Sequence, residues 1–451
     1  MRRSISGPLM VIAIGVLFFL NNFFPDVFTW RSLALYWPFL LIGLGIIRLI
    51  EVLVDAGRAR PIGPPRFSGG GLVLVVIACI FFWGVSKSSR SHWRGTPFPF
   101  VHMGPAGMFG ESFDFDVKQS LPVTAADARV LLEGLKGNVT VSGDDSSDVV
   151  VSGRKTIHAF SRNTAKQADH RTQIEIVRNG NDIVVRSTGS PEHDDLSISY
   201  DVDIKVPRRM SLSAQGSPEN VTAESLDGNV DISGGNGNVR LTSIGGNVRV
   251  ETTKRKDLVR AIGIKGNLDL RGTGTDLQLE DVIGQVTIQG NYFGTLEFRN
   301  LAKPLHFESE QTDLRVEKLP GSISMDLGDF RADNIVGPLR LRCQSRDVHI
   351  SNFSNDLEVN IERGDIELNP QRTPLAKMDV HLRAGDIDLT LPEKGPFDLR
   401  GSTSQGDVEN QYGNGIATNS EGRTASIKSE ASSGPVITVT TDRGNITVKK
   451  S

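Results

Sequence analysis

The chain has 451 residues, 50 of them basic and 53 acidic, so its formal net charge is only −3. This even balance gives no sign of nucleic-acid binding and excludes a polyanionic tail. Glycine is abundant at 47 residues and aromatic residues make up only 6%, which is typical of many short strands and tight turns, while the absence of a three-residue glycine period excludes a collagen.

Three apolar runs occupy the first 86 residues: Gly7–Phe24, Leu33–Val54 and Gly71–Val85. The first two have 18 and 22 residues, close to the roughly 20 that a membrane-spanning helix needs, and flanking residues can extend the third. We therefore predict a transmembrane region over residues 1–86, with helices at about 7–24, 33–54 and 69–86. A cleaved signal peptide is the poorer interpretation, because no small-residue cleavage pattern follows the first run.

Basic residues in the short loops indicate the orientation of this region. Arg2 and Arg3 precede the first run, and three arginines lie between the second and third runs, whereas the loop between the first two holds only Arg31. This distribution predicts a cytoplasmic N-terminus and places everything after the third span outside the cytoplasmic membrane, in the periplasm or at the cell surface. Three basic residues just after the third run favour the opposite orientation.

The second apolar run begins with a recognisable pattern. Trp37–Gly45 reads W-P-F-L-L-I-G-L-G and fits W-P-x-x-L-I-x-L-G. The N-terminal region resembles the membrane region of the Lia family of bacterial cell-envelope stress proteins. This resemblance implies a role in envelope stress and a membrane sensor kinase as a partner.

Residues 87–112 are rich in Pro, Gly and Ser without any period, and we predict a flexible linker there. His92, His102 and Met103 are the metal ligands that this segment could offer, but their irregular spacing favours a plain linker.

A two-residue alternation begins at Phe113, where Phe113, Phe115 and Val117 fall on one face of a strand. Residues 113–210 are therefore predicted to be a β-rich part leading into the repeats, with one short surface helix at Ser161–His170. Its further predicted strands are Val139–Val141, Val149–Val151, Ile174–Val177, Ile183–Val185 and Ile198–Val206.

From residue 211 to the C-terminus a unit close to G-[ND]-φ-x-φ recurs, where φ is apolar. Gly-Asn-Val begins at Gly228, Gly237 and Gly246, nine residues apart each time, and most later copies follow at 8 to 11 residues. In φ-x-φ the two apolar side chains point one way and the polar middle residue the other. A three-residue strand cannot bury its apolar side alone, so successive units must coil around a shared interior.

We therefore predict an all-β fold over residues 211–451, a single-stranded β-helix or β-solenoid whose coils hold two or three strands. Gly364, Gly385 and Gly406 are 21 residues apart, which favours coils of about 18–21 residues with two strands. A β-propeller would need longer strands and a longer period. Glycine and Asn or Asp suit the corners, and the glycines assigned to repeat turns are Gly228, Gly237, Gly246, Gly266, Gly364, Gly385, Gly406 and Gly444.

The order of these parts carries a second resemblance. S-Y-D-V-D-I-K-V-P at 199–207, followed by the Gly-Asn-Val repeats, resembles the bacterial putative adhesin family over roughly residues 120–450. That likeness implies a β-solenoid body in the cell envelope, and it brings no catalytic residues with it.

Enzymes that cut polysaccharides also use β-helices, so carboxylates on one exterior face need examination. Asp365, Asp386 and Asp407 would form a column in a regular coil, and a Ca²⁺ site is conceivable there. Corner residues that accept a backbone N–H are the favoured interpretation, because Asn229, Asn238 and other asparagines take the same place in earlier repeats.

No known catalytic or phosphate-binding motif appears in the chain, and we predict neither a catalytic residue nor a cofactor. The two cysteines can form neither a disulfide framework nor a metal cluster, and Cys343 is in phase with Leu339 and Leu341, which predicts a small core residue.

Three hypotheses follow. The first is a non-enzymatic, membrane-anchored envelope protein whose adhesin-like solenoid binds proteins or cell-wall polymers. The second is an envelope-stress sensing or regulatory protein that acts through its membrane region on a sensor kinase. The third and least favoured is a glycan-active β-helix enzyme that uses Asp365 and Asp386.

Overall fold

The computed structural model describes residues 111–124, 128–189, 196–216, 218–234, 237–252, 256–370, 375–430 and 433–451. All of them belong to one compact unit, Met103–Ser451. Among these residues no helix has the length and apolar character needed to span a membrane. The three predicted spans, together with His92, His102 and Met103, lie outside the described residues.

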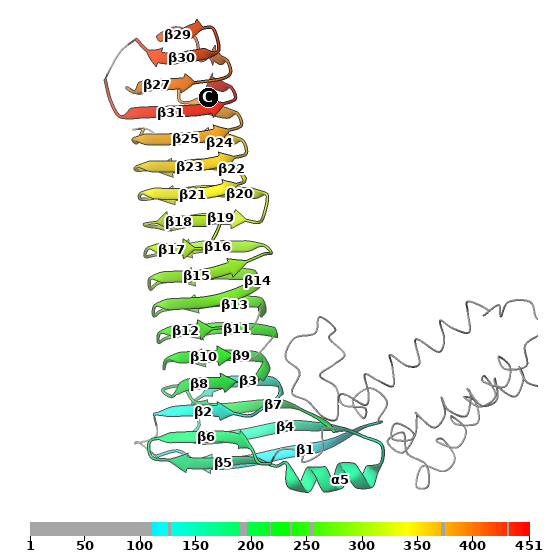
Figure 1. Ribbon diagram of the computed structural model, residues 1–451. Helices are drawn as coiled ribbons and strands as arrows, with labels where there is room; N and C mark the ends of the chain where they lie inside the picture. The colour runs from blue at the N-terminus through cyan, green and yellow to red at the C-terminus, as the bar shows by residue number, and fades with distance from the viewer. Residues whose placement is uncertain are drawn as a thin grey trace, which may run out of the picture. The chain divides into compact units, whose positions relative to one another are not determined.

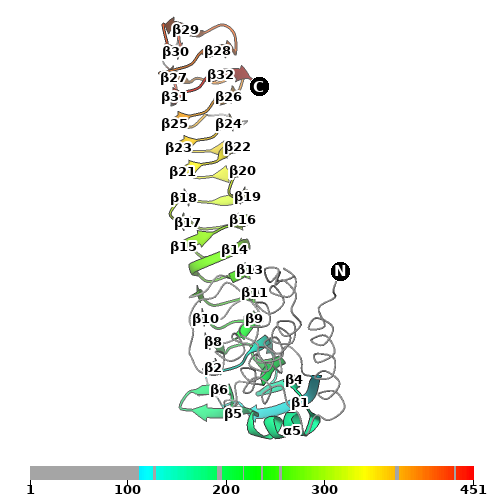
Figure 2. The same cartoon turned by 45° about the vertical axis from the view of Figure 1, so that its right-hand side comes forward.

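The described residues form a long, narrow pile of strands, shown in Figure 1 and, turned by 45°, in Figure 2. Along most of the chain, successive strands alternate between two side-by-side stacks, and β14 bends from one stack into the other. The first stack contains, in spatial order, β5 (Ile174–Asn179), β6 (Asp182–Ser187), β2 (Arg129–Glu133), β8 (Ser211–Gly216), β10 (Val230–Gly234), β12 (Val248–Glu251), the start of β14 (Leu268–Val282), β15 (Val286–Tyr292), β17 (Leu305–Glu308), β18 (Thr312–Val316), β21 (Leu339–Ser345), β23 (Leu357–Arg363), β25 (Met378–Ala384), β31 (Val436–Arg443), β27 (Asp398–Thr403), β30 (Thr424–Ser429) and β29 (Ile416–Glu421).

The second stack faces the first across the interior. It contains, again in spatial order, β1 (Glu111–Pro122), β4 (Asp148–Ala159), β7 (Ser197–Pro207), β3 (Gly137–Asp144), β9 (Pro218–Leu226), β11 (Gly237–Ile244), β13 (Lys256–Ile264), the end of β14, β16 (Leu296–Leu301), β19 (Leu319–Met325), β20 (Asp329–Val336), β22 (Asp347–Ser354), β24 (Ile366–Asn369), β26 (Ile387–Leu391), β32 (Ile446–Lys450) and β28 (Val408–Gln411).

Each coil therefore holds two strands, one from each stack. Val230 pairs with Val248 in the first stack, 18 residues on, while Val239 lies in β11 of the second stack. All three side chains are buried, with at most 2% of their surface exposed. The nine-residue Gly-Asn-Val spacing is thus half a coil, and the prediction of an all-β solenoid with inward apolar pairs is confirmed.

One coil runs against its neighbours. A turn at residues 309–311 reverses the chain between β17 and β18, and a second turn at residues 326–328 reverses it again between β19 and β20. As a result β18 and β19 are antiparallel to the strands on both sides of them. The sequence T-D-L-R-V at residues 312–316 looks like any other repeat, so this reversal was not part of the predicted regular coil.

The chain also inserts a coil near each end of the pile. At the C-terminal end, β31 lies between β25 and β27, and β32 lies between β26 and β28. At the other end, β2 lies between β6 and β8, and β3 lies between β7 and β9. Antiparallel strands follow beyond both inserted coils, namely β4 and β1 at one end and β30 and β29 at the other.

The single described helix, α5 (Arg162–Arg171), packs on β4 and β1. Ser161 caps its N-terminus by accepting a 3.2 Å hydrogen bond from the N–H of Thr164. Ala165 and Ala168 face Phe113 and Phe115, forming a small cluster separate from the main core. The sequence predicted this helix at Ser161–His170, so the predicted helix begins and ends one residue before α5.

Candidate binding groove and the corner ladders

The repeat glycines stand at the corners between the two stacks. Gly228, Gly246, Gly266 and Gly284 occupy one column, and Gly237 lies at the opposite corner. A Cβ atom added at Gly266 would lie 2.3 Å from the carbonyl oxygen of Gly246, which no side chain tolerates. The backbone of each coil therefore packs directly on that of the coil before it.

A second glycine column occupies the Gly237-type corner near the C-terminal end of the pile. Gly364, Gly385, Gly444 and Gly406 follow one another there, with φ between 127° and 159°. Added Cβ atoms would come within 1.9 to 2.0 Å of a carbonyl oxygen in the neighbouring coil. Glycine is needed here both for its backbone conformation and for space.

The residues after the corner glycines form hydrogen-bonded ladders along the pile. Asn229 Oδ1 accepts the N–H of Asn247 at 2.8 Å, and Asn247 Oδ1 accepts that of Asn267 at 2.9 Å. Asn220 and Asn238 make the same bond at the other corner. Each asparagine side chain thus accepts a backbone N–H of the next coil. Without this bond, the N–H would have to bond to water.

The predicted aspartate column has the same geometry. Asp365 Oδ1 accepts the N–H of Asp386 at 2.9 Å, and Asp386 Oδ1 accepts that of Asn445 at 2.7 Å. Asn445 Oδ1 in turn accepts the N–H of Asp407 at 2.9 Å. The structure therefore places Asp365 next to Asp386 but separates Asp386 from Asp407 by Asn445, because β32 is inserted there. The equal 21-residue spacing had suggested an unbroken column.

These carboxylates do not gather into a metal centre in the part of the chain that the structure describes. There, no group of three or more His, Cys, Asp or Glu side chains could hold a metal ion. Asp365 and Asp386 each use one oxygen on a backbone N–H of the next coil. The arrangement stabilises the corner.

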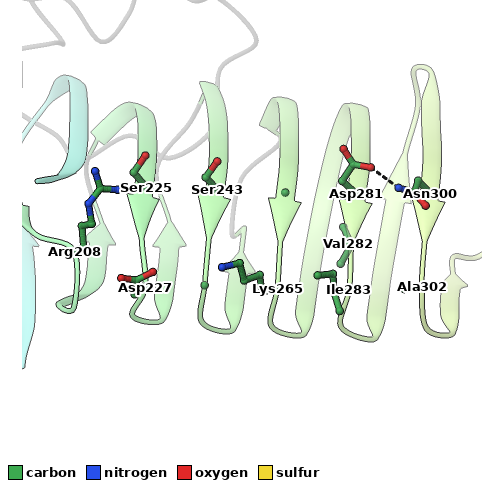
Figure 3. Close-up of a pocket in the computed structure, with 12 residues that line it drawn as sticks. Arg208, Ser225, Asp227, Ser243, Lys265, Asp281, Val282, Ile283, Asn300 and Ala302 are labelled. Carbon is green, nitrogen blue, oxygen red and sulfur yellow. Dashed lines mark hydrogen bonds between the residues drawn. The ribbon is translucent and has the colours of Figure 1, made fainter.

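A groove of about 570 Å³ crosses the coils beside the Gly228-type corner, on the second-stack side. Figure 3 shows its two rows of residues, which run across the strands from β9 to β16. In this view the upper row contains Ser225, Ser243, Asp281 and Asn300, and the lower row contains Asp227, Lys265, Ile283 and Ala302, with Arg208 at the end beside Ser225 and Asp227. Gly263 continues the upper row next to Ser243, and Gly245 continues the lower row next to Asp227.

An unusual backbone conformation creates the upper row. Ser225, Ser243, Gly263 and Asp281 all have φ between 56° and 70°, and Asn300 has 49°. This left-handed region suits glycine and small polar residues that bond locally. Each such residue precedes the last buried apolar residue of its strand, so the strand kinks outward before the corner and leaves the hollow. Asn300 Nδ2 donates to Asp281 Oδ1 at 2.5 Å along the row.

The groove offers mixed chemistry to a ligand. Arg208 and Lys265 alternate with Asp227 and Asp281, so the lining is close to neutral. Arg208 Nε also donates to Asp145 at 3.0 Å. Ile283 is 54% exposed and gives the groove an apolar contact. No histidine or cysteine is among the residues that line it.

A second hollow, of about 500 Å³, lies over the reversed coil on the first stack. Arg315 and Arg340 face each other directly across β18 and β21. Arg340 and Arg342 both donate to Glu358 Oε1, at 2.7 and 3.1 Å. Desolvation opposes ionisation of Glu358, but these bonds outweigh it and lower its pKa. The charges of Arg340, Arg342 and Glu358 are therefore largely neutralised within the protein, unlike the charges that line the first groove.

Cys343 lies in the interior at the reversed coil, with 6% of its surface exposed. Burial raises the pKa of its thiol to about 11, so it stays protonated and unreactive at neutral pH. The prediction of a buried core cysteine agrees with this position.

The groove was missed in the sequence, although a signal for it exists. The signal is a four-residue pattern: a residue with positive φ, then an apolar residue, then any residue, then glycine. It occurs as S-L-D-G from residue 225, S-I-G-G from 243, G-I-K-G from 263 and D-V-I-G from 281. The same order recurs as N-I-V-G at residue 334, where φ is 55°. The G-[ND]-φ-x-φ pattern starts after this stretch and so overlooks it.

Two protein families match the chain. The family described as Toastrack DUF4097 matches residues 138–449. The family described as LiaF transmembrane domain matches residues 6–102. These matches confirm both resemblances drawn from the sequence, and the chain thus joins a membrane-anchoring domain to a Toastrack domain. Among curated proteins, none matches this chain.

Solved structures of two bacterial proteins are among those similar to this chain. One, a putative cell adhesion protein from Clostridium sporogenes, has 9% identity and a TM-score of 0.17, and the match covers 75% of this chain and 100% of that one. The other, a putative adhesin from Parabacteroides distasonis, has 9% identity and a TM-score of 0.18, with 78% and 100% covered. The family match spans well over half of the sequence, so the chain belongs to the Toastrack DUF4097 family.

Proposed function

We propose that this protein is a non-enzymatic envelope protein that presents its solenoid outside the cytoplasmic membrane and binds an extended partner, either a protein segment or a cell-wall polymer, along the groove. The observation that carries the proposal is the groove itself. Its two rows repeat from coil to coil, so it offers similar contacts at regular steps of about 5 Å. An elongated ligand can use such steps in succession, whereas a small molecule would fill only a part of them.

The lining supports binding of a polar chain with some apolar character. Ser225, Ser243 and Asn300 supply neutral hydrogen-bonding groups, and Lys265 and Asp281 supply opposite charges. Ile283 supplies the exposed apolar surface. Each contact is weak in water, so affinity must come from several coils acting together.

The test is binding of the full-length protein, reconstituted in lipid discs, to isolated cell walls and to envelope protein extracts. Ile283→Asp places a charge in the groove, and we expect it to weaken binding at least tenfold. Phe293→Asp is the matched control, because Phe293 is 48% exposed at the opposite corner, outside the groove. Equal binding by the wild type and Ile283→Asp, or an equal loss with Phe293→Asp, would refute the groove as the site.

A second function is favoured by the LiaF transmembrane domain match over residues 6–102. In this alternative the membrane region acts on a sensor kinase, and the solenoid senses the state of the envelope. Replacing residues 1–86 with an unrelated membrane anchor separates the two proposals. Loss of an envelope-stress response with unchanged groove binding supports regulation through the membrane region, and an unchanged response contradicts it.

A further inference from the structure

The outer face of α5 is basic. Arg162, Lys166 and His170 follow one another at four-residue intervals, and Arg171 ends the helix. All four are exposed, whereas Ala165 and Ala168 on the opposite face are buried. Because side chains four residues apart lie on the same side of a helix, Arg162, Lys166 and His170 form a stripe that points away from the solenoid. Arg171, about 180° around the helix from Arg162, flanks the exposed face on its other side.

No described carboxylate neutralises this stripe. The only acidic residue of the helix, Asp169, forms its ion pair with the buried Lys155 of β4. Lys155 Nζ also donates to the carbonyl oxygens of Asp169 and Thr172, at 3.0 and 2.8 Å. Within the described part of the chain, Arg162, Lys166 and Arg171 therefore form no ion pair. Phe160, one residue before the helix cap, adds a side chain that is 53% exposed.

The helix lies at the end of the pile where the chain arrives from its membrane domain. In Figures 1 and 2, α5 lies beside β1 and β4, at the end opposite β29 and β30. The third predicted span ends near residue 86, within the LiaF transmembrane match over residues 6–102, and β1 begins at Glu111. The 24 residues between them, 87–110, reach at most about 85 Å when fully extended. The basic stripe is thus carried by the end that is tethered most closely to the bilayer.

We propose that the outer face of α5 binds the anionic phospholipid headgroups of the membrane that holds the transmembrane domain. Each Lys or Arg near an anionic surface strengthens association by about fivefold. Because the tether keeps the helix at high effective concentration near the lipid, three such charges suffice without deep insertion. Phe160 is placed to enter the headgroup layer as an apolar anchor. This contact is independent of the groove and would fix the base of the solenoid on the bilayer.

The full-length protein in vesicles tests this directly. Gln167→Cys places a fluorescent label on the outer face of α5, and Asn419→Cys places one on β29 at the far end of the pile. Cys79→Ser removes one native thiol, and the buried Cys343 thiol stays unreactive. A quencher attached to lipid headgroups then reports which label lies at the membrane surface.

We expect strong quenching at residue 167 and little at residue 419, only in vesicles that contain anionic lipid, and reversal by added salt. Arg162→Gln/Lys166→Gln/Arg171→Gln should lower quenching at residue 167 to the level seen in uncharged vesicles. The matched control removes three exposed arginines elsewhere, Arg363→Gln/Arg383→Gln/Arg423→Gln, and should change nothing.

Two results overturn the proposal. One is an equal loss of quenching in the control variant. The other is a lack of quenching at residue 167 in anionic vesicles, as expected if Glu192, Asp194 and Asp195 neutralised the helix instead, or quenching that is the same in uncharged vesicles. Success or failure of this test leaves the groove proposal untouched, because it measures no ligand of the groove.

Discussion

Single atoms at the corners decide whether the coils can stack. Gly385 combines a φ of 141° with a carbonyl oxygen 2.0 Å from where its Cβ would stand. Gly413 also has a positive φ, 105°, but nothing lies within 4 Å of its added Cβ. Comparing substitutions at Gly385 and Gly413 therefore separates two losses of folding free energy, one from backbone strain and one from forcing two coils apart.

Gly385→Ala should lower the free energy of unfolding by roughly 2–5 kcal/mol, since strain and steric overlap add. Gly413→Ala should cost only about 1–2 kcal/mol, because it introduces strain alone. Thermal unfolding of the full-length protein, followed by circular dichroism, measures both. Equal shifts of the two midpoints would show that the close packing of coils at this corner is incorrect.

The ladder makes a different prediction at Asp365. Asp365→Ala removes the acceptor of the Asp386 N–H and should cost about 1 kcal/mol, whereas Asp365→Asn keeps an oxygen in place and should cost little. The same unfolding experiment, run with and without Ca²⁺, distinguishes a ladder from a cation site. A Ca²⁺-dependent rise in the wild-type midpoint that is lost in Asp365→Asn would replace the ladder by a metal site.

The regular parallel order of the strands is broken at the reversed coil, where one buried arginine, Arg346, bonds to both turns. Arg346 is 8% exposed, and its Nε donates to the carbonyl oxygen of Asp326 at 2.6 Å while Nη1 donates to Thr312 Oγ1 at 2.5 Å. Thr312 follows the first turn and Asp326 begins the second. Burial lowers the pKa of Arg346, yet its hydrogen bonds keep the guanidinium in place.

Arg346→Met should therefore cost roughly 1–3 kcal/mol, because Asp326 and Thr312 lose their partner inside the protein. Faster amide hydrogen exchange confined to residues 312–328 is the expected signature. Arg331→Met is the control, since Arg331 pairs with Asp329 in the exposed surface and should cost under about 1 kcal/mol. Exchange that rises evenly along the whole pile would mean that Arg346 does not hold the turns.

The sequence predicted the elements far better than their order in space. Alternation and corner glycines depend on neighbouring residues, so the strands, α5 and the buried Val230, Val239 and Val248 could be predicted. The reversal could not, because T-D-L-R-V has the same apolar pattern in either direction. The inserted β31 and β32 could not either, since pairing between distant strands leaves no local mark. The groove follows from left-handed backbone at residues such as Ser243, which the repeat pattern skips.

At the scale of the whole molecule, the inserted coils and antiparallel end strands explain why the pile has defined ends. A parallel solenoid would expose open edges to which further strands could add. Here β29 is short and its residues 418–421 are polar and exposed, and its partner β30 runs antiparallel to β27. Polar residues on this edge strand disfavour the addition of further strands there.

The side of the membrane that the solenoid occupies decides which partners it can reach. Asn419→Cys in a Cys79→Ser background offers one exposed thiol on β29. A membrane-impermeant maleimide should label it in intact spheroplasts as fully as after lysis, with a cytoplasmic protein as the control for leakage. Labelling only after lysis would place the solenoid in the cytoplasm and contradict both the proposed function and its partners.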